Sequence, residues 1–338
     1  MYKRFYGFTR QPFDLSPDPE RVFMSETHRE GLAILKYGVV AKKGFLVLTG
    51  PVGTGKTTLL QALIHSLEGD IHCCLLTNPT LSRDEFFAFL AHQYELPWRE
   101  NKALFLIEFS RFLKECSNKN EQVLLIVDEA HVIPVDLLEE IRLLSNQDTS
   151  GGDVFSIFLV GQPELNTHLS NERLLPLRQR IGIRFHLDLF SRDVTVQYIV
   201  YRLRTAGAKH LDIFTEDALT LIHRVSKGTP RLINIVCDHA LLTGFADNKS
   251  EIDVDMIREC VDELHFPGEA NPLPVATKQK KHTWVYRLFL FILVGGLLSL
   301  GLILLEVLPV DGVYSPLANV LPENWLQWLH HLYENIGG

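Results

Sequence analysis

Short apolar runs alternate with amphipathic stretches through the first half of this chain. Five runs have the length expected of buried strands, and they lie at 45–48, 71–76, 123–127, 155–160 and 184–187. Between them, apolar residues recur at helical spacing over 26–40, 57–67, 82–95, 101–116 and from the third run to about residue 144. Strands that alternate with helices predict a parallel sheet covered on both faces.

The pattern changes after Ser191, because no strand signal appears from there to about Leu264. Helical patterns at 191–206, 215–226, 230–246 and 253–264 predict a small all-helical second domain. We therefore divide the chain into segments. They are an N-terminal linker and helix at 1–43, an α/β domain at 44–190, a helical lid domain at 191–266, a polar basic linker at 267–283, an apolar segment at 284–306 and a tail at 307–338.

The apolar segment predicts one membrane-spanning helix. Leu288 to Leu305 is a run of eighteen uncharged residues, roughly 27 Å at helical rise, close to the hydrocarbon thickness. The alternative is a buried core helix. Lysines precede the run and no Lys or Arg follows it, so the positive-inside rule places residues 1–283 in the cytoplasm. An amphipathic helix around Trp325 and Trp328 is expected to rest on the outer interface or to contact a partner.

Charge and cysteine content narrow the function classes. The net charge is −8, and it becomes −5 without the segment after Thr283, which holds one of the 33 basic and four of the 41 acidic residues. An acidic balance argues against non-specific nucleic-acid binding. The five cysteines form no C-x-x-C pair, so we expect neither a disulfide framework nor a zinc site, and the pattern suits a reducing compartment.

The sequence Gly50-Pro-Val-Gly-Thr-Gly-Lys-Thr57 fits the phosphate-binding pattern G-x-x-x-x-G-K-[ST]. Glycines allow backbone N–H groups to face the phosphates, and the following helix offers its positive end. We expect Lys56 to reach the β- and γ-phosphates and Thr57 to hold Mg²⁺. The expected nucleotide-binding residues of the loop are Gly50, Pro51, Val52, Gly53, Thr54, Gly55, Lys56, Thr57 and Thr58.

A second motif follows the third predicted strand. Asp128 and Glu129 stand directly after the apolar run 123–127, at the strand end where nucleotides bind in open α/β sheets. We expect Asp128 to hold Mg²⁺ together with Thr57, and Glu129 to act on the attacking water as general base. The alternative is a pair of solvated acids. The fold class is therefore an α/β P-loop NTPase domain followed by a helical domain and one transmembrane helix.

These motifs and several others make the chain resemble the AAA+ ATPases and, among them, the general secretion pathway protein A (ExeA-like) family. The further segments that carry the resemblance are Gln11-Pro-Phe13, Asp128-Glu-Ala-His131, Leu159-Val-Gly-Gln-Pro-Glu-Leu165, Leu177-Arg-Gln-Arg-Ile181 and Gly228-Thr-Pro-Arg-Leu-Ile-Asn234. The resemblance covers roughly residues 1–265. Longer family members carry a periplasmic peptidoglycan-binding domain, for which the residues after the apolar run leave no room, so relatives that serve pilus biogenesis or exopolysaccharide export are better guides.

The resemblance implies further site residues. Gln162 matches the sensor-1 position, with a plain turn residue as the alternative, and Arg231 matches sensor 2. Arg180 matches the arginine finger, which acts on a neighbouring subunit, and Arg178 is its rival. The family's N-terminal linker lies near the adenine, which makes Phe23, Thr27 and His28 candidates for the base pocket, with a core role as the alternative for Phe23.

The sequence therefore predicts an ATP- and Mg²⁺-dependent hydrolase anchored in the inner membrane, with its C-terminus periplasmic. It would act as a homo-oligomeric ring or filament with membrane-embedded secretion or export proteins. One alternative is an oligomeric DNA-binding ATPase regulator of the transposition (TniB-like) type. Another is a scaffold that binds ATP without hydrolysing it.

Overall fold

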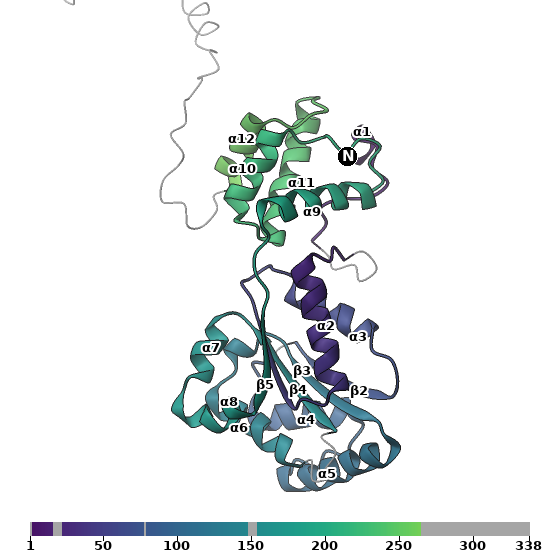
Figure 1. Ribbon diagram of the computed structural model, residues 1–338, viewed down its shortest axis with the longest axis vertical. Coiled ribbons are helices and arrows are strands. Elements are labelled where there is room, and N and C mark those ends of the chain that lie inside the picture. Colours follow the sequence, from purple (N-terminus) through teal and green to yellow (C-terminus); the bar gives the residue numbers. More distant parts are fainter. Residues whose placement is uncertain (1, 16–21, 78, 148–153, 265–338) are drawn as a thin grey trace, which may run out of the picture. The chain divides into compact units, whose positions relative to one another are not determined.

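A parallel five-stranded sheet organises the first part of the protein. The computed structural model describes residues 2–15, 22–77, 79–147 and 154–264 (Figure 1). The strand order is β2-β3-β4-β1-β5, and the pairs are parallel. The strands are β1 (Phe45–Thr49), β2 (Ile71–Leu76), β3 (Gln122–Val127), β4 (Phe155–Gly161) and β5 (Ile181–His186). All five predicted strands are confirmed.

Both faces of this sheet are apolar and covered. In β1 and β4 every residue is buried, as expected for interior strands between two helical layers. Leu46 and Leu48 belong to the cluster shared with α2 (Glu26–Val40) and α3 (Lys56–His65), whereas Phe45 and Val47 face the opposite cluster. The alternation follows the two-residue period of a strand.

The opposite face is covered by the helices that follow β2, β3 and β4. These are α4 (Arg83–Gln93), α5 (Lys102–Lys119), α6 (Val135–Leu144), α7 (Glu164–Leu169) and α8 (Leu175–Arg180). The predicted helices among them are confirmed. The sequence did not indicate α7 and α8, because six residues are too few to show a helical period.

Four helices form the second part: α9 (Arg192–Thr205), α10 (Glu216–Ser226), α11 (Pro230–Ala246) and α12 (Val254–Leu264). They lie together in Figure 1 and share one apolar cluster, which confirms the four predicted helices. N-terminal aromatic residues enter the same cluster; these are Tyr2 from α1 (Tyr2–Phe5), Phe8 and Phe13. The chain's first residues thus pack on the helical part rather than on the sheet.

Within the described residues, no helix is both long enough and apolar enough to cross a bilayer. The predicted membrane helix at 284–306, the basic linker and the tail at 307–338 lie outside the described residues.

Candidate functional site

The glycine-rich loop between β1 and α3 forms the floor of a cavity of about 830 Å³. The loop begins where the buried strand β1 ends and closes at Gly55, which caps α3 with a φ of 95°. Gly53 also has a positive φ, 78°. Glycine adopts this conformation without strain. Residues 52 to 58 line the cavity, so the loop and the start of α3 offer their N–H groups to it.

Lys56 lies under the loop and is 5% exposed. Its Nζ donates hydrogen bonds to the carbonyl oxygens of Gly50 at 2.8 Å and Pro51 at 3.0 Å. Burial lowers the pKa of Lys56, while the negative charges of Glu129 and Asp128 oppose that shift. An ammonium group held between loop carbonyls and carboxylates is placed to bind an anion above the loop.

Asp128 and Thr57 meet although they are far apart in sequence. The Thr57 hydroxyl donates to Asp128 Oδ2 at 2.7 Å, and Asp128 Oδ1 accepts from the Glu129 N–H at 2.9 Å. Asp128 is 3% exposed. The hydroxyl and carboxylate oxygens are hard donors of the kind that Mg²⁺ prefers, so these two residues fit that ion.

Glu129 extends from the end of β3 to the rim of the cavity, which it lines. Its backbone is left-handed, with a φ of 53°, a conformation that costs a non-glycine residue about 1 kcal/mol and that occurs often at functional sites. Its carboxylate lies 3.3 Å from His131 Nδ1, and the Gln162 N–H lies 3.4 Å from the same nitrogen. This nitrogen can donate to the carboxylate when it carries a proton, or accept from the Gln162 N–H when it does not. Gly161 leaves room for this ring, because a Cβ there would lie 3.3 Å from His131 Nδ1. The sequence motif contains His131, but nothing in it indicated that this ring would lie between Glu129 and the Gln162 N–H.

The predicted sensor and finger residues lie in different surroundings. Gln162 follows β4, between the ends of β1 and β3, but does not line the cavity. Arg231 lines the cavity from the start of α11, and its N–H donates to Gly53 O at 3.4 Å. Arg180 is exposed and donates to Ser145 Oγ, so it stands away from this chain's own cavity. Arg178 is half-buried on the same helix and does not line the cavity either.

Other residues of the cavity lining come from the N-terminal segment, α9 and α11. Arg202 donates from Nε to Pro12 O and from Nη2 to Asp14 O, each at 2.6 Å. The Tyr198 hydroxyl donates to Asn234 Oδ1 at 2.8 Å and accepts from Arg202 at 3.1 Å. All five residues line the cavity. The sequence did not indicate this group, whose members are separated by up to 222 residues.

The three base-pocket candidates have different positions. Phe23 lines the cavity but packs edge-on against Phe190 and Tyr198, so it also belongs to the helical core. His28 lines the cavity, and its Nε2 lies 3.0 Å from Thr54 O. Thr27 does not line the cavity and contacts Ser25 Oγ at 2.9 Å.

His28 connects α2 to the phosphate loop. Ser25 Oγ accepts from the His28 N–H at 3.2 Å and lies 2.7 Å from Nδ1. A neutral ring that accepts at Nδ1 and donates from Nε2 to the Thr54 carbonyl satisfies every contact. Burial lowers the pKa of His28, which favours this neutral form. The residue therefore stabilises the loop rather than supplying charge.

Comparisons with known proteins agree with this geometry. Residues 40–169 match a family described as AAA domain. General secretion pathway protein A of Aeromonas hydrophila is 38% identical over 255 residues, which are 75% of this chain and 46% of that protein. The chain thus spans about half the length of that relative, and the resemblance predicted from the motifs is confirmed.

Other similarities concern the fold more broadly. Holliday junction branch migration complex subunit RuvB of Thermosipho melanesiensis is 28% identical over 252 residues, 71% of this chain and 70% of that protein. The structure of the Aeropyrum pernix ORC2 protein in its ADPNP-ADP complexes has a TM-score of 0.55 at 18% identity, covering 76% of this chain and 72% of that chain. The α/β P-loop fold is therefore confirmed.

Proposed function

Since the chain is a P-loop protein of the AAA class that resembles general secretion pathway protein A, we propose that it hydrolyses ATP to ADP and phosphate. The observation that carries this proposal is the convergence of Lys56, Thr57 and Glu129 on one cavity, with Asp128 bonded to Thr57 behind it. A phosphate-binding loop alone would explain binding. A carboxylate at the rim, beside the buried acid that pairs with Thr57, adds a group that can accept a proton from water.

The phosphates bind along the loop in this proposal. The N–H groups of residues 53 to 58 face the β- and γ-phosphates, and Lys56 exchanges its loop carbonyl partners for phosphate oxygens. Thr57 and Asp128 would hold Mg²⁺, which would neutralise negative charge on the phosphates. The adenine base of ATP lies in the part of the cavity that the N-terminal segment and Tyr198 line.

Glu129 accepts the proton of the attacking water. His131 orients this carboxylate when its Nδ1, 3.3 Å away, carries the proton that it donates to the carboxylate. Gln162, at the sensor-1 position, offers its backbone N–H to the same nitrogen when that nitrogen is unprotonated. Arg231 approaches from α11 over Gly53 and acts as sensor 2.

Hydrolysis depends on assembly in this proposal. Arg180 is exposed and does not line this chain's cavity. Both properties are expected of an arginine finger that enters a neighbouring subunit's site. Such a residue stabilises transition-state charge and raises the rate by about 10³-fold or more. A homo-oligomer, a ring or filament, would therefore be the active form.

We also propose that residues 284–306 anchor the protein in the inner membrane, with the segments at 1–43, 44–190 and 191–266 forming the cytoplasmic ATPase. The support is the uncharged run 288–305 and the basic residues before it. The ATPase would then drive or time the assembly of an envelope secretion, pilus or polysaccharide-export machine. If the protein stays soluble in cell lysates without detergent, the anchor is wrong.

Glu129→Gln tests the reaction. The variant should bind ATP with unchanged affinity and release phosphate at least about 10²-fold more slowly, the usual contribution of a general base. Glu164→Gln is the matched control, because this carboxylate also acts on Lys56 through its charge and has no assigned role. Equal phosphate release by wild type and Glu129→Gln would refute the catalytic assignment, and ATP binding without any turnover in wild type would favour the scaffold.

A second candidate function is DNA handling, which the similarity to RuvB favours. The acidic balance of residues 1–283 opposes it. A binding titration of the full chain against duplex DNA at several salt concentrations separates the two. Tight binding that weakens steeply with salt would support the DNA function, and its absence would leave the envelope function.

A further inference from the structure

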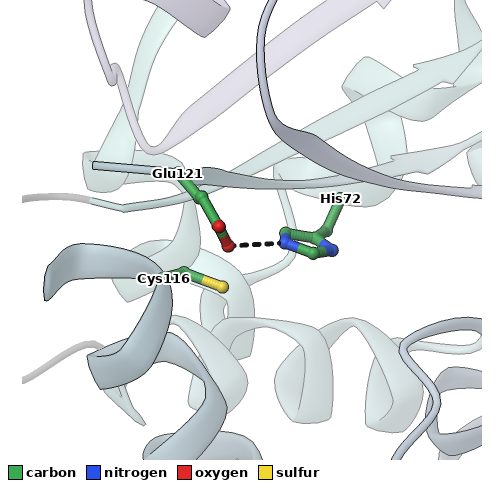
Figure 2. Close-up of side chains that lie close together, drawn as sticks. All are labelled: His72, Cys116 and Glu121. Carbon is green, nitrogen blue, oxygen red and sulfur yellow. Dashed lines mark hydrogen bonds and ion pairs between the residues drawn. The ribbon is translucent and has the colours of Figure 1, made fainter. Parts of the chain in front are cut away.

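Three side chains with metal-binding atoms converge beside the edge strand of the sheet, away from the nucleotide cavity. His72 of β2, Cys116 of α5 and Glu121 before β3 bring one ligand atom each within 4.8 Å of one another (Figure 2). His72 Nε2 lies 2.9 Å from Glu121 Oε2. The Cys116 side chain points toward this pair from the end of the helix in Figure 2.

The backbone fixes two of the three ligands. The Glu121 N–H donates to Cys116 O at 2.8 Å, and the Asn120 N–H donates to Ser117 O at 3.1 Å. Asn120 is left-handed, with a φ of 58°. These bonds form a Schellman motif, which brings the residue two places past the helix against the residue in its last turn. An apolar contact is usual there, whereas this chain places a thiol against a carboxylate.

The third ligand is fixed by strand pairing and by a ring contact. β2 and β3 pair in parallel with Ile71 opposite Gln122, which places His72 beside Glu121. The Phe112 ring of α5 packs edge-on against the imidazole at 5.2 Å. All three ligands are thus oriented by elements that the sheet already holds, so little ordering would be needed to bind an ion.

Burial and charge distinguish this cluster from an ordinary surface ion pair. Cys116 is 2% exposed, whereas the His72 side chain is 41% exposed, so the thiol is buried while the imidazole side is open to solvent. Burial, together with the charge of the adjacent Glu121, raises the pKa of Cys116 to about 11. Lys119 lies 4.0 Å from the other carboxylate oxygen. A divalent cation would balance the two negative charges of a thiolate and a carboxylate.

We propose that His72 Nε2, Cys116 Sγ and Glu121 Oε2 bind a zinc ion, with water as the fourth ligand on the exposed side. Zinc accepts nitrogen, sulfur and oxygen donors together in a tetrahedral site. On binding, the Cys116 proton passes to solvent, and the metal replaces the contact between His72 and Glu121. The ligands are too far apart in sequence to form a recognisable spacing, which explains why the cysteine pattern gave no zinc prediction.

A metal bound at this site would link the edge strand β2 to α5. Among the residues that the structure describes, strand β2 has a partner strand on one side only, and a metal bridge to the end of the helix would stabilise this edge. Metal removal should therefore lower the thermal midpoint of the protein, and the ATP cavity should keep its affinity because it lies at the other end of the strands.

Cobalt(II) provides the direct probe, because a thiolate ligand gives it an intense near-ultraviolet charge-transfer band that oxygen ligands at the Mg²⁺ site do not. The full-length protein in detergent, stripped with a chelator, should develop this band at an equimolar amount of cobalt and lose it when zinc is added. Cys116→Ser should abolish the band, and His72→Gln should weaken cobalt binding by more than about 10-fold, as expected for a metal-site residue.

Cys73→Ser is the matched control, because Cys73 adjoins His72 on β2 but packs with the apolar cluster on the α2 and α3 face of the sheet. It should leave the band unchanged, and ATP binding by every variant verifies the fold. No band in wild type, or a band that survives in Cys116→Ser, would show that the cluster is a hydrogen-bonded pair beside a buried thiol and would overturn the proposal.

Discussion

The two sides of the nucleotide cavity are built in opposite ways. The loop side is one unbroken run, residues 52–58, which lines the cavity and contains a single lysine. The other side is assembled from Pro12, Asp14, Tyr198, Arg202 and Asn234, whose side chains and carbonyls meet only in the fold. A site made of backbone requires glycines at fixed spacing, whereas a site made of side chains requires only that the fold bring them together.

The largest effect is expected on the loop side, from Lys56→Ala. Loss of the buried ammonium removes charge-assisted hydrogen bonds worth about 3 kcal/mol, so ATP affinity should fall by at least about 100-fold. Fluorescent-nucleotide titration measures this. Lys36→Ala, on the neighbouring helix α2, is the control and should bind as wild type does. Unchanged affinity in Lys56→Ala would remove the loop from the site.

Gly53→Ala tests the close approach of the helical part to the loop. A Cβ at Gly53 would lie 2.9 Å from Arg231 Cβ, and the φ of 78° is strained for alanine. Gly69→Ala is a matched control, because Gly69 has a φ of 90° and nothing within 4 Å of the added carbon. Both should lose about 1 kcal/mol of stability to backbone strain, but only Gly53→Ala should also weaken ATP binding, by about 10-fold.

If the two glycine variants bind ATP equally well, the contact between Gly53 and Arg231 has no role in the site. Chemical denaturation gives the free energy of unfolding for each variant, so that the shared strain can be subtracted from the binding difference.

Arg202→Ala tests the part of the cavity that is assembled from distant segments of the chain. This change leaves the carbonyls of Pro12 and Asp14 without their donor, at a cost of about 1–3 kcal/mol of stability. ATP affinity should fall about 10-fold, less than for Lys56→Ala, because the N-terminal segment is released while the phosphate loop stays intact. Arg204→Ala, an exposed arginine of the same helix, should change neither quantity. A loss of ATP affinity as large as that of Lys56→Ala would contradict the expected order of the two variants.

The smallest effect concerns pH and His28. Burial lowers the pKa of His28 below its ordinary 6.5, so protonation favours the unfolded chain. The stability contributed by neutral His28 is complete above pH 6.5 and is lost as pH falls through the lower folded-state pKa. His28→Asn should flatten the decline in unfolding free energy below pH 6.5, whereas His65→Asn, at an exposed histidine, should not. If the unfolding free energies of wild type and His28→Asn decline in parallel below pH 6.5, His28 is not the cause of the decline.

The same contrast explains what the sequence could predict. Strands such as β1 and β3 are continuous apolar runs, and the motifs at their ends place Lys56 and Asp128 at one edge of a parallel sheet before any coordinates are known. Arg202 and the His72, Cys116 and Glu121 cluster could not be predicted, because each depends on chain segments that meet through tertiary packing. Even His131, which lies inside a recognised motif, meets Glu129 and the Gln162 N–H only in the folded chain, where it packs against Gly161.

Calorimetric titration of the purified chain with ATP tests the central claim, that a triphosphate binds between this loop and the facing N-terminal segment. With Mg²⁺ present, we predict saturable binding at equimolar ATP and chain, and much weaker binding when Mg²⁺ is chelated, because Thr57 and Asp128 share the ion with the phosphates. Absence of measurable ATP binding with Mg²⁺ supplied would contradict the account.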